Sequence, residues 1–572
     1  MSESNFVHVA ARLDGFAELA PERPAVREAL RRDPRRFREV TFAELAARSR
    51  RIATGLAARG LQAGERVSVF VTPGVDLIAI TFGLLRLGAV PVLIDPGMGR
   101  KALLACVERM APVALIGVSR AQTARRLFPS AFRSIRHNFG VGRPPLWFAE
   151  PLSRVEREGR DEPFVADVAP ADPAAILFTS GSTGPPKGVV ATHGILASQA
   201  EALEQLYGFG PGDVDLACFP LFALFDTALG MTSVIPQLDP SRPAACDPAR
   251  LLATANAAGV TAAFGSPAIW KRVDEHLQRS GGRLERCRHL LMAGAPVEAG
   301  LIERLRPRLA SGGEIHTPYG ATECLPVSSP AGAEILNPEI RRRSLSGSGT
   351  PLGQPAPGMT VRVIEVVDRP LERLEDAREL PAGEVGEFVV SGPVATPAYA
   401  ENPEATRRAK TRDAHGRLWH RMGDLGRIDS AGRLWFCGRV VHRLQLEQGD
   451  VPCVPLENAF APHPAARRVA VVGAGEPGHQ LTHLIVEPAA PLPKEPAARA
   501  ELAREILSAG LEHLEGDPDR KPPAFAGVLF HAPFPVDVRH NAKIHRLELA
   551  ELAAERRRTG QLDLDALPHL PK

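Results

Sequence analysis

A large net charge, paired cysteines and long apolar runs are all missing from this sequence of 572 residues. The formal net charge is only +3, which gives no electrostatic argument for nucleic acid as a partner. Seven cysteines are present, an odd number without a CxxC pair, so neither a zinc site nor a disulfide framework is expected. A reducing compartment, the cytoplasm, fits this cysteine usage best.

No transmembrane or secretory segment is expected either. The longest apolar stretch, residues 77–94, is interrupted by Arg86 and contains two glycines, so it predicts a helix followed by a buried strand. The amino-terminal residues do not combine a basic segment with a following apolar one. The composition, 44% hydrophobic and 24% charged residues, is that of a folded soluble protein.

Alternating strand and helix patterns predict a large α/β unit. Apolar or β-branched runs typical of buried parallel strands occur at residues 67–72, 90–94, 174–178, 260–264, 289–292 and 314–316. From about residue 359, short strands separated by turns predict a barrel-like piece, and an α+β pattern returns after residue 439. We therefore predict the α/β class. A large amino-terminal domain of wound α/β sheets with a barrel-like subdomain would span residues 1–438, and a small mobile α+β domain would span residues 439–572.

A loop rich in glycine and hydroxyl groups follows one of these strands. It reads TSGSTGPPKG and contains Thr179, Ser180, Gly181, Ser182, Thr183, Gly184 and Lys187. Glycines permit close backbone approach, and backbone N–H groups, hydroxyls and a lysine together suit a polyphosphate. Two prolines precede the lysine, so the loop is not a Walker A motif. A flexible surface loop is the alternative explanation.

This loop resembles the phosphate-binding signature of the adenylate-forming superfamily, which includes acyl-CoA ligases, luciferases and nonribosomal adenylation domains. Further motifs of that family follow in the same order: Ala293-Gly294-Ala295-Pro296, Tyr319-Gly320-Ala321-Thr322-Glu323, Gly423-Asp424, Gly438-Arg439, Pro455-x-Glu457 and Lys543-Ile544. The resemblance extends from about residue 40 to about residue 550. It implies an enzyme that uses ATP and Mg²⁺ to convert a carboxylic acid into an acyl-adenylate and pyrophosphate.

The resemblance implies a role for the motifs around the nucleotide. The loop residues and Lys187 would hold the β- and γ-phosphates. The adenine would be contacted by Gly294, Ala295 and Pro296 and stacked upon by Tyr319, and Gly320 and Ala321 would also belong to the ATP site. Thr322 would contact the α-phosphate. Glu323 would coordinate Mg²⁺, a cation that suits one or two carboxylates combined with phosphate oxygens.

Three further residues receive roles in the same way. Asp424 would accept hydrogen bonds from both ribose hydroxyls, because a carboxylate has two acceptor oxygens. Arg439 would approach the ribose and begin a hinge. Lys543 would bridge the substrate carboxylate and the α-phosphate, where negative charge grows during the reaction. Each residue also has an ordinary structural explanation, as a turn carboxylate or a surface cation.

The sequence departs from the family pattern at several positions. Ala223 replaces the usual histidine of an aromatic gate, and Met422 replaces the usual threonine before Gly-Asp. Val440-Val441 stands where the hinge usually has Asp or Lys, and Ala542 stands where glycine usually precedes the lysine. In acyl-CoA ligases the small domain rotates about that hinge to form the thioester, so an apolar hinge and an altered gate argue against that second half-reaction.

These departures resemble the olefin β-lactone synthetases of bacterial long-chain hydrocarbon biosynthesis. The segments PLFALFDTALGMTSVIP, LDPSRPA and VRHNAKIHR carry that resemblance. It implies a 2-alkyl-3-hydroxy fatty acid as substrate, a β-lactone, AMP and pyrophosphate as products, and no need for coenzyme A. Attack by the substrate's own 3-hydroxyl avoids the entropy cost of a second reactant. The resemblance also implies assembly with neighbouring pathway enzymes, one of which decarboxylates the lactone to an olefin.

The base for that hydroxyl and the walls of the alkyl pocket are less well defined. His193 and His316 are candidates for the base, although a structural histidine near the ATP site explains either one more simply. Apolar residues that could line a pocket, or equally form core, are Phe222, Leu224, Phe225, Leu229, Met231 and Ile235. The same ATP motifs are compatible with a fatty acyl-CoA ligase or acyl-AMP ligase. A non-catalytic scaffold is a further alternative, which the retained Thr322, Glu323, Asp424 and Lys543 argue against.

Overall fold

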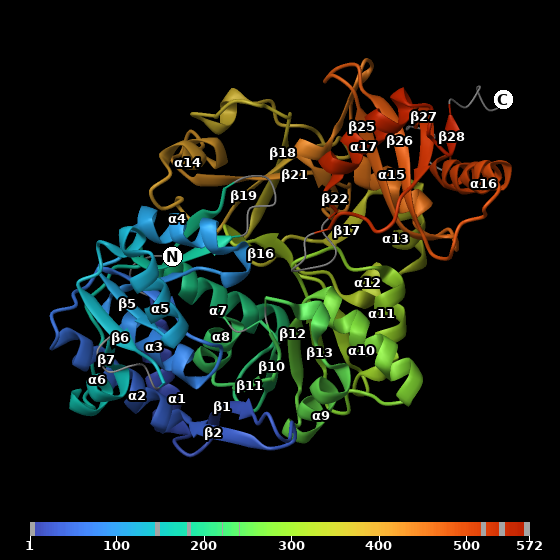
Figure 1. Ribbon diagram of the computed structural model, residues 1–572. Helices are drawn as coiled ribbons and strands as arrows, with labels where there is room; N and C mark the ends of the chain where they lie inside the picture. The colour runs from blue at the N-terminus through green and yellow to red at the C-terminus, as the bar shows by residue number, and fades with distance from the viewer. Residues whose placement is uncertain are drawn as a thin grey trace. The chain divides into compact units, whose positions relative to one another are not determined.

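The computed structural model of the protein divides into two compact units (Figure 1). The first unit comprises Met1–Val327, Ala356–Thr360 and Ser391–His420, and the second comprises Ser328–Pro355, Val361–Val390 and Arg421–Lys572. The structure describes residues 6–142, 149–179, 185–219, 221–239, 241–515, 522–536 and 544–565.

The first unit contains two seven-stranded sheets. One sheet has the order β14 (Glu314–His316), β13 (His289–Met292), β12 (Ala262–Gly265), β10 (Val214–Ala217), β11 (Thr232–Ile235), β1 (Pro24–Ala29) and β2 (Phe37–Thr41). Neighbouring strands of this sheet are parallel from β14 to β1, and only β2 is antiparallel to its neighbour. A wound parallel sheet of this kind places the carboxyl ends of its strands along one edge.

The other sheet follows the same principle. Its order is β7 (Glu150–Pro151), β6 (His137–Gly140), β5 (Ala114–Gly117), β3 (Arg66–Phe70), β4 (Val90–Leu93), β8 (Pro173–Thr179) and β9 (Lys187–Thr192). These strands are parallel except for β9, which runs antiparallel to β8. The β8–β9 pair therefore forms a hairpin at the edge of the sheet, and the predicted phosphate loop connects its strands.

Several helices of this unit contribute to one core with both sheets, among them α1 (Val9–Leu19), α2 (Phe42–Ala57) and α3 (Val75–Leu87). Helix α3 is apolar around its whole circumference, and all its residues except Asp76 are buried, as expected for a helix enclosed by other elements. The remaining helices of this unit are α4 (Arg100–Met110), α5 (Ser119–Leu127), α6 (Leu152–Glu158), α7 (His193–Tyr207), α8 (Phe222–Ala228), α9 (Pro248–Ala258), α10 (Pro267–Ser280), α11 (Ala299–Leu305) and α14 (Pro403–Ala409).

The short strands predicted after residue 359 lie in one sheet, whose described pairings include antiparallel ones. Its order is β17 (Thr350–Gly353), β22 (Leu434–Arg439), β21 (Leu418–Ile428), β19 (Gly386–Ser391) and β18 (Thr360–Ile364), and β20 (Lys410–Arg412) pairs with β21. Two smaller hairpins are β15 (Tyr319–Ala321) with β16 (Cys324–Ser328), and β23 (Leu444–Leu446) with β24 (Gly449–Val451).

The carboxyl-terminal part of the second unit is an α+β layer. Its sheet has the order β25 (Ala466–Ala474), β26 (Leu481–Pro488), β27 (Phe525–Phe530) and β28 (Leu564–Asp565). Successive residues of β25 alternate between two cores: Val469 and Val471 face α15 (Cys453–Phe460) and α16 (Pro496–Leu514), while Ala470 and Val472 face α17 (Arg546–Arg558). Both faces are therefore covered by helices. Two short helices, α12 (Gly332–Ile335) and α13 (Pro338–Arg343), also belong to this unit.

The predicted fold class is confirmed by these sheets and their helices. Strands β13 and β14 have the predicted bounds, the helix predicted in residues 77–94 is α3, and most other predicted strands differ by one to three residues. The domain boundary predicted near residue 439 coincides with the end of β22. The two units are defined by how the chain packs, whereas the boundary predicted at residue 439 is a hinge. The predicted domain boundary therefore stays a prediction. In the described part of the chain, no helix is both long and apolar enough to cross a membrane.

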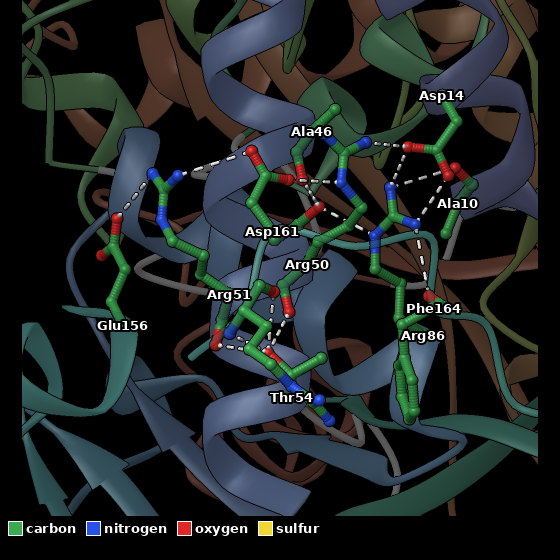
Figure 2. Close-up of polar contacts among 12 residues, drawn as sticks. Ala10, Asp14, Ala46, Arg50, Arg51, Thr54, Arg86, Glu156, Asp161 and Phe164 are labelled. Atoms are coloured by element: carbon green, nitrogen blue, oxygen red, sulfur yellow. Dashed lines mark hydrogen bonds and ion pairs between the residues drawn. The ribbon is translucent and has the colours of Figure 1, made fainter. Parts of the chain in front are cut away.

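A network of arginines fixes α1 to the rest of the first unit (Figure 2). Arg86, whose side chain is fully buried, donates to both carboxylate oxygens of Asp14 at 2.7 Å and to the Ser49 hydroxyl at 2.8 Å. Arg50 donates to Asp14 at 2.8 Å and to Asp161 at 2.7 Å. Two parallel N–H···O bonds between Arg86 and Asp14 give a strong, directional ion pair. The charge that interrupts the apolar stretch is thus neutralised inside the core.

We expect Arg86→Met to lower the free energy of unfolding by roughly 3 kcal/mol, near the lower end for breaking a buried ion pair, because Asp14 keeps Arg50 as a partner. Urea-induced unfolding of the variant and the wild type measures the difference. The matched control is Arg154→Met, which removes an exposed pair with Glu158 and should leave stability almost unchanged. Equal effects of the two substitutions would contradict the assigned role of Arg86.

Candidate active site

Two predicted nucleotide motifs follow adjacent parallel strands. Leu290 of β13 is paired with Ile315 of β14, so the turn at residues 293–296 and the segment at residues 317–323 leave the sheet at the same edge. Gly294 has φ of 90°, a left-handed conformation that favours glycine. Gly294 and Pro296 are exposed, and Ala295 is half-buried. Ligands of wound α/β sheets bind at such carboxyl ends, which is where the adenine contacts are predicted.

The YGATE segment forms a tight hairpin beyond β14. Strands β15 and β16 flank a turn that contains Thr322 and Glu323, and the side chains of Tyr319, Thr322 and Glu323 are half-buried. A Cβ atom at Gly320 would lie 2.5 Å from the carbonyl oxygen of Cys324, so no larger residue fits there without a backbone shift. The glycine of the motif is therefore explained by close approach within the hairpin.

The predicted phosphate loop is closed by the β8–β9 hairpin. Thr179 pairs with Lys187 and Phe178 pairs with Gly188 in an antiparallel register. Ser180, Gly181, Ser182, Thr183 and Gly184 lie outside the described residues. The two strands thus hold the ends of the predicted loop together, and Lys187 begins the strand that leaves it.

Lys187 and Glu323 meet at one tyrosine that sequence analysis did not select. The hydroxyl of Tyr399 donates to Glu323 Oε1 at 2.7 Å, and the Lys187 ammonium lies 5.1 Å from the centre of the Tyr399 ring. Tyr399 is buried, and it forms an antiparallel bridge with Val189 of β9. The scarcity of tyrosine, three residues in the whole chain, was the one signal that could have drawn attention to it.

A buried lysine and a threonine complete this cluster. Thr396 donates from both its amide and its hydroxyl to the carbonyl oxygen of Glu323, at 2.9 and 3.0 Å. Lys410 donates to the Thr396 hydroxyl oxygen at 3.2 Å. Burial lowers the pKa of Lys410 to about 8, against the opposing effect of Glu323 and Cys324. Lysine, glutamate and two hydroxyl groups therefore converge in the first unit.

Asp424 and Arg439 come together in the second unit. They face each other across β21 and β22, and a guanidinium nitrogen lies 2.9 Å from the Asp424 carboxylate. The same arginine donates to the carbonyl oxygen of Met422 at 3.3 Å. Asp424 is buried, and Gly423 before it has φ of 65°. The ribose contacts assigned to these two residues stay predictions.

Lys543 lies outside the described residues, but the segment after it is firmly held. Ile544 forms a bridge with Val536. Arg546 donates to both carboxylate oxygens of Glu457, at 2.8 and 2.6 Å. Burial lowers the pKa of His442 to about 4, helped by the cations of Arg546 and Arg439. The predicted hinge entry and the segment that follows Lys543 are thus neighbours within the second unit.

The two candidate bases lie in separate buried aromatic clusters. The His193 ring lies 4.8 Å from that of His8, the residue just before α1. His316 lies 5.0 Å from the Tyr207 ring, and its Nε2 is 3.3 Å from Nδ1 of His289. Burial lowers the pKa of both His193 and His316 to about 4. Both imidazoles are therefore neutral at pH 7, which core packing explains without any catalytic role.

Most of the apolar segment proposed as pocket or core is core. Phe222 stacks on Phe264 with ring centres 4.3 Å apart, and it packs with Leu229 and Met231. Asp226 of α8 accepts a hydrogen bond from Ser233 of β11 at 2.7 Å. Ile235 is also buried, whereas Leu224 and Phe225 are partly buried.

The His8–His193 pair predicts a loss of stability in acid. Burial lowers the pKa of His8 to about 3 and that of His193 to about 4, from 6.5. The unfolded chain therefore binds more protons between pH 6.5 and about 4, so the free energy of unfolding falls as the pH falls through this window. The contribution of His193 corresponds to about 3 kcal/mol.

We expect His193→Leu to flatten this acid-side loss, because leucine does not titrate. Urea-induced unfolding at a series of pH values between 7 and 4.5 measures it. His415→Leu, at an exposed histidine, is the control and should retain the wild-type pH dependence. An unchanged slope in the His193 variant would contradict the assignment.

Comparison with known sequences assigns the chain to a family. The sequence profile described as AMP-binding enzyme matches residues 13–400. An olefin beta-lactone synthetase of Xanthomonas campestris pv. campestris is 43% identical over 526 residues, which is 91% of each chain. An olefin beta-lactone synthetase of Stenotrophomonas maltophilia is 41% identical over 564 residues, 96% of this chain and 98% of the relative.

Comparison with solved structures supports the fold. The anthranilate CoA ligase AuaEII in complex with anthranoyl-AMP superposes with a TM-score of 0.76 at 20% identity, covering 97% of this chain and 100% of that one. A point mutant of the amide bond synthetase Mcba of Marinactinospora thermotolerans gives 0.74 at 21% identity, covering 96% and 100%. At such identities the likeness concerns the fold alone.

Proposed function

Since the chain belongs to the family of AMP-binding enzymes and is an ATP-dependent adenylate-forming enzyme, we propose that it forms a β-lactone from a long-chain 2-alkyl-3-hydroxyalkanoic acid. ATP would activate the carboxylate, and AMP and pyrophosphate would be released. The observation that carries this proposal is the 41–43% identity, over more than nine tenths of the chain, to enzymes named olefin beta-lactone synthetases.

Two departures from acyl-CoA ligases support the same choice. Ala223, at the position of the gate histidine, is fully buried in the core and presents no imidazole to a substrate. Val440 and Val441 occupy the short helical turn after β22, and Val441 is 52% exposed. We infer that residues 439–572 act as a lid for adenylation, and that coenzyme A is not a substrate.

In the adenylation step, a carboxylate oxygen of the acid bonds to the α-phosphorus as the bond to pyrophosphate breaks. Lys187 would pair with the outer phosphates, and Thr322 would donate to the α-phosphate. Bound Mg²⁺ would neutralise phosphate charge, and Glu323 is the residue that would hold it. Among the described residues, no group of three or more His, Cys, Asp or Glu side chains could hold a metal ion. A cation at Glu323 would therefore take further ligands from phosphate and water.

In the second step, the 3-hydroxyl oxygen of the bound acyl-adenylate attacks its own carbonyl carbon. The bond to AMP breaks, the hydroxyl proton passes to a base, and the four-membered ring closes. Holding both reacting groups on one chain supplies the proximity that a second substrate would otherwise have to provide. A decarboxylating enzyme of the same pathway would consume the lactone, and both would act in the cytoplasm, where the seven free cysteines stay reduced.

We expect Lys543→Ala to lower pyrophosphate release by about 10²–10³-fold, because one electrostatic stabiliser of the transition state is lost. ATP binding should change little. The matched control is Lys494→Ala, at an exposed lysine of the same unit, which should release pyrophosphate at the wild-type rate. Near-wild-type release by the Lys543 variant would defeat the assignment.

The product identifies the second step. We expect incubation with ATP, Mg²⁺ and a long-chain 2-alkyl-3-hydroxy acid, without coenzyme A, to yield a β-lactone detectable by NMR. The matched substrate is the same acid without the hydroxyl, which should stop at the acyl-adenylate because it carries no internal nucleophile. A thioester that forms only with coenzyme A would instead identify an acyl-CoA ligase. No pyrophosphate release with any acid would identify a non-catalytic scaffold.

A further inference from the structure

We propose that Tyr399 is a positioning residue for the metal ligand Glu323, a role that rests on the proposed use of Mg²⁺ by this enzyme. Tyr399 lies 76 positions beyond Glu323 in the sequence and outside every motif that predicted the site. It would act through Glu323 and would not touch the reacting atoms.

The carboxylate of Glu323 is oriented by this tyrosine. The Tyr399 hydroxyl donates to Oε1 at 2.7 Å, which is a short O–H···O⁻ hydrogen bond. A carboxylate has two oxygens, so one can accept from the tyrosine while the other coordinates a cation. Because Mg²⁺ demands near-ideal octahedral geometry, a carboxylate fixed in one orientation binds it better than a freely rotating one.

The backbone of Glu323 is held from the same segment. Thr396 donates twice to the Glu323 carbonyl oxygen, and Lys410 donates to the Thr396 hydroxyl. Thr396 and Lys410 are both buried. Residues 396–410 thus fix the main chain of the metal ligand through Thr396 and its side chain through Tyr399. This leaves the half-buried carboxylate little freedom.

The other side of Tyr399 contacts the phosphate-binding hairpin. The ammonium of Lys187 lies 5.1 Å from the ring centre, within reach of the attraction between a cation and an aromatic face. One rigid side chain therefore separates the cation assigned to the phosphates from the carboxylate assigned to the metal. Phenylalanine would fill the same space and keep the ring contact, so the hydroxyl is the part that serves Glu323.

The test is the Mg²⁺ dependence of Tyr399→Phe. We expect the Mg²⁺ concentration for half-maximal pyrophosphate release to rise by about 10–100-fold, the usual cost of removing a partner that orients a metal ligand. At saturating Mg²⁺ the rate should return to within severalfold of the wild type. A merely structural role would lower the rate at every Mg²⁺ concentration without moving the midpoint, and that result would overturn the proposal.

A readout without turnover separates this proposal from the function it rests on. Mn²⁺ binding in the presence of ATP, followed by the EPR signal of the free ion, should weaken in Tyr399→Phe by a similar factor. Glu323→Gln should weaken it at least as much. Thr411→Val removes a buried hydroxyl beside Lys410 that has no hydrogen-bond partner among the described residues, and it should leave Mn²⁺ binding unchanged.

The outcomes are distinguishable. If the wild-type enzyme released pyrophosphate but formed no lactone, the proposed second step would be refuted. A shift of the Mg²⁺ midpoint in Tyr399→Phe would still support the role of Tyr399. An unchanged Mn²⁺ affinity in Tyr399→Phe would overturn that role even if lactone forms. Absence of Mn²⁺ uptake by the wild type with ATP would overturn the metal role of Glu323, and the role of Tyr399 with it.

Discussion

Backbone pairing between the β8–β9 hairpin and the segment around Tyr399 is the constraint on which the first unit's site depends. The amide of Ala400 donates to the carbonyl oxygen of Gly188 at 2.7 Å, and that of Val190 donates to Ala398 at 3.1 Å. These hydrogen bonds fix the position of Tyr399 along the hairpin. The side chain then reaches both Lys187 and Glu323, although the three residues come from distant parts of the sequence.

Buried arginine–carboxylate pairs occur in both units and play the same structural role. Arg86 with Asp14, Arg421 with Glu387 and Arg546 with Glu457 each bury a charge beside its partner. Such pairs rarely add stability compared with apolar packing, but removing one partner is costly because a buried charge is left alone. Their value here is positional: Arg546 lies three residues after Lys543, and Arg421 precedes Gly423-Asp424 in the same strand.

The sequence was sufficient to predict the fold class and several element bounds, because β-branched runs and a mostly apolar helix such as α3 carry strong local signals. It also named Glu323 and Lys187 as candidate site residues, since both belong to recognisable local motifs. It could not predict that Tyr399 contacts both, nor that Arg86 meets Asp14. Those contacts depend on long-range register, which a pattern of neighbouring residues does not encode. The apolar residues around Phe222 were ambiguous for the same reason.

The hydrogen bond between Tyr399 and Glu323 also limits where this chain can be divided. A fragment that ended shortly before Tyr399 would retain the whole β8–β9 hairpin and the YGATE hairpin, yet it would lose the strand partner of the one and the hydroxyl partner of the other. Split-enzyme complementation or domain grafting should therefore place its junction after β20. Both hairpins and residues 391–412 then stay in the same fragment.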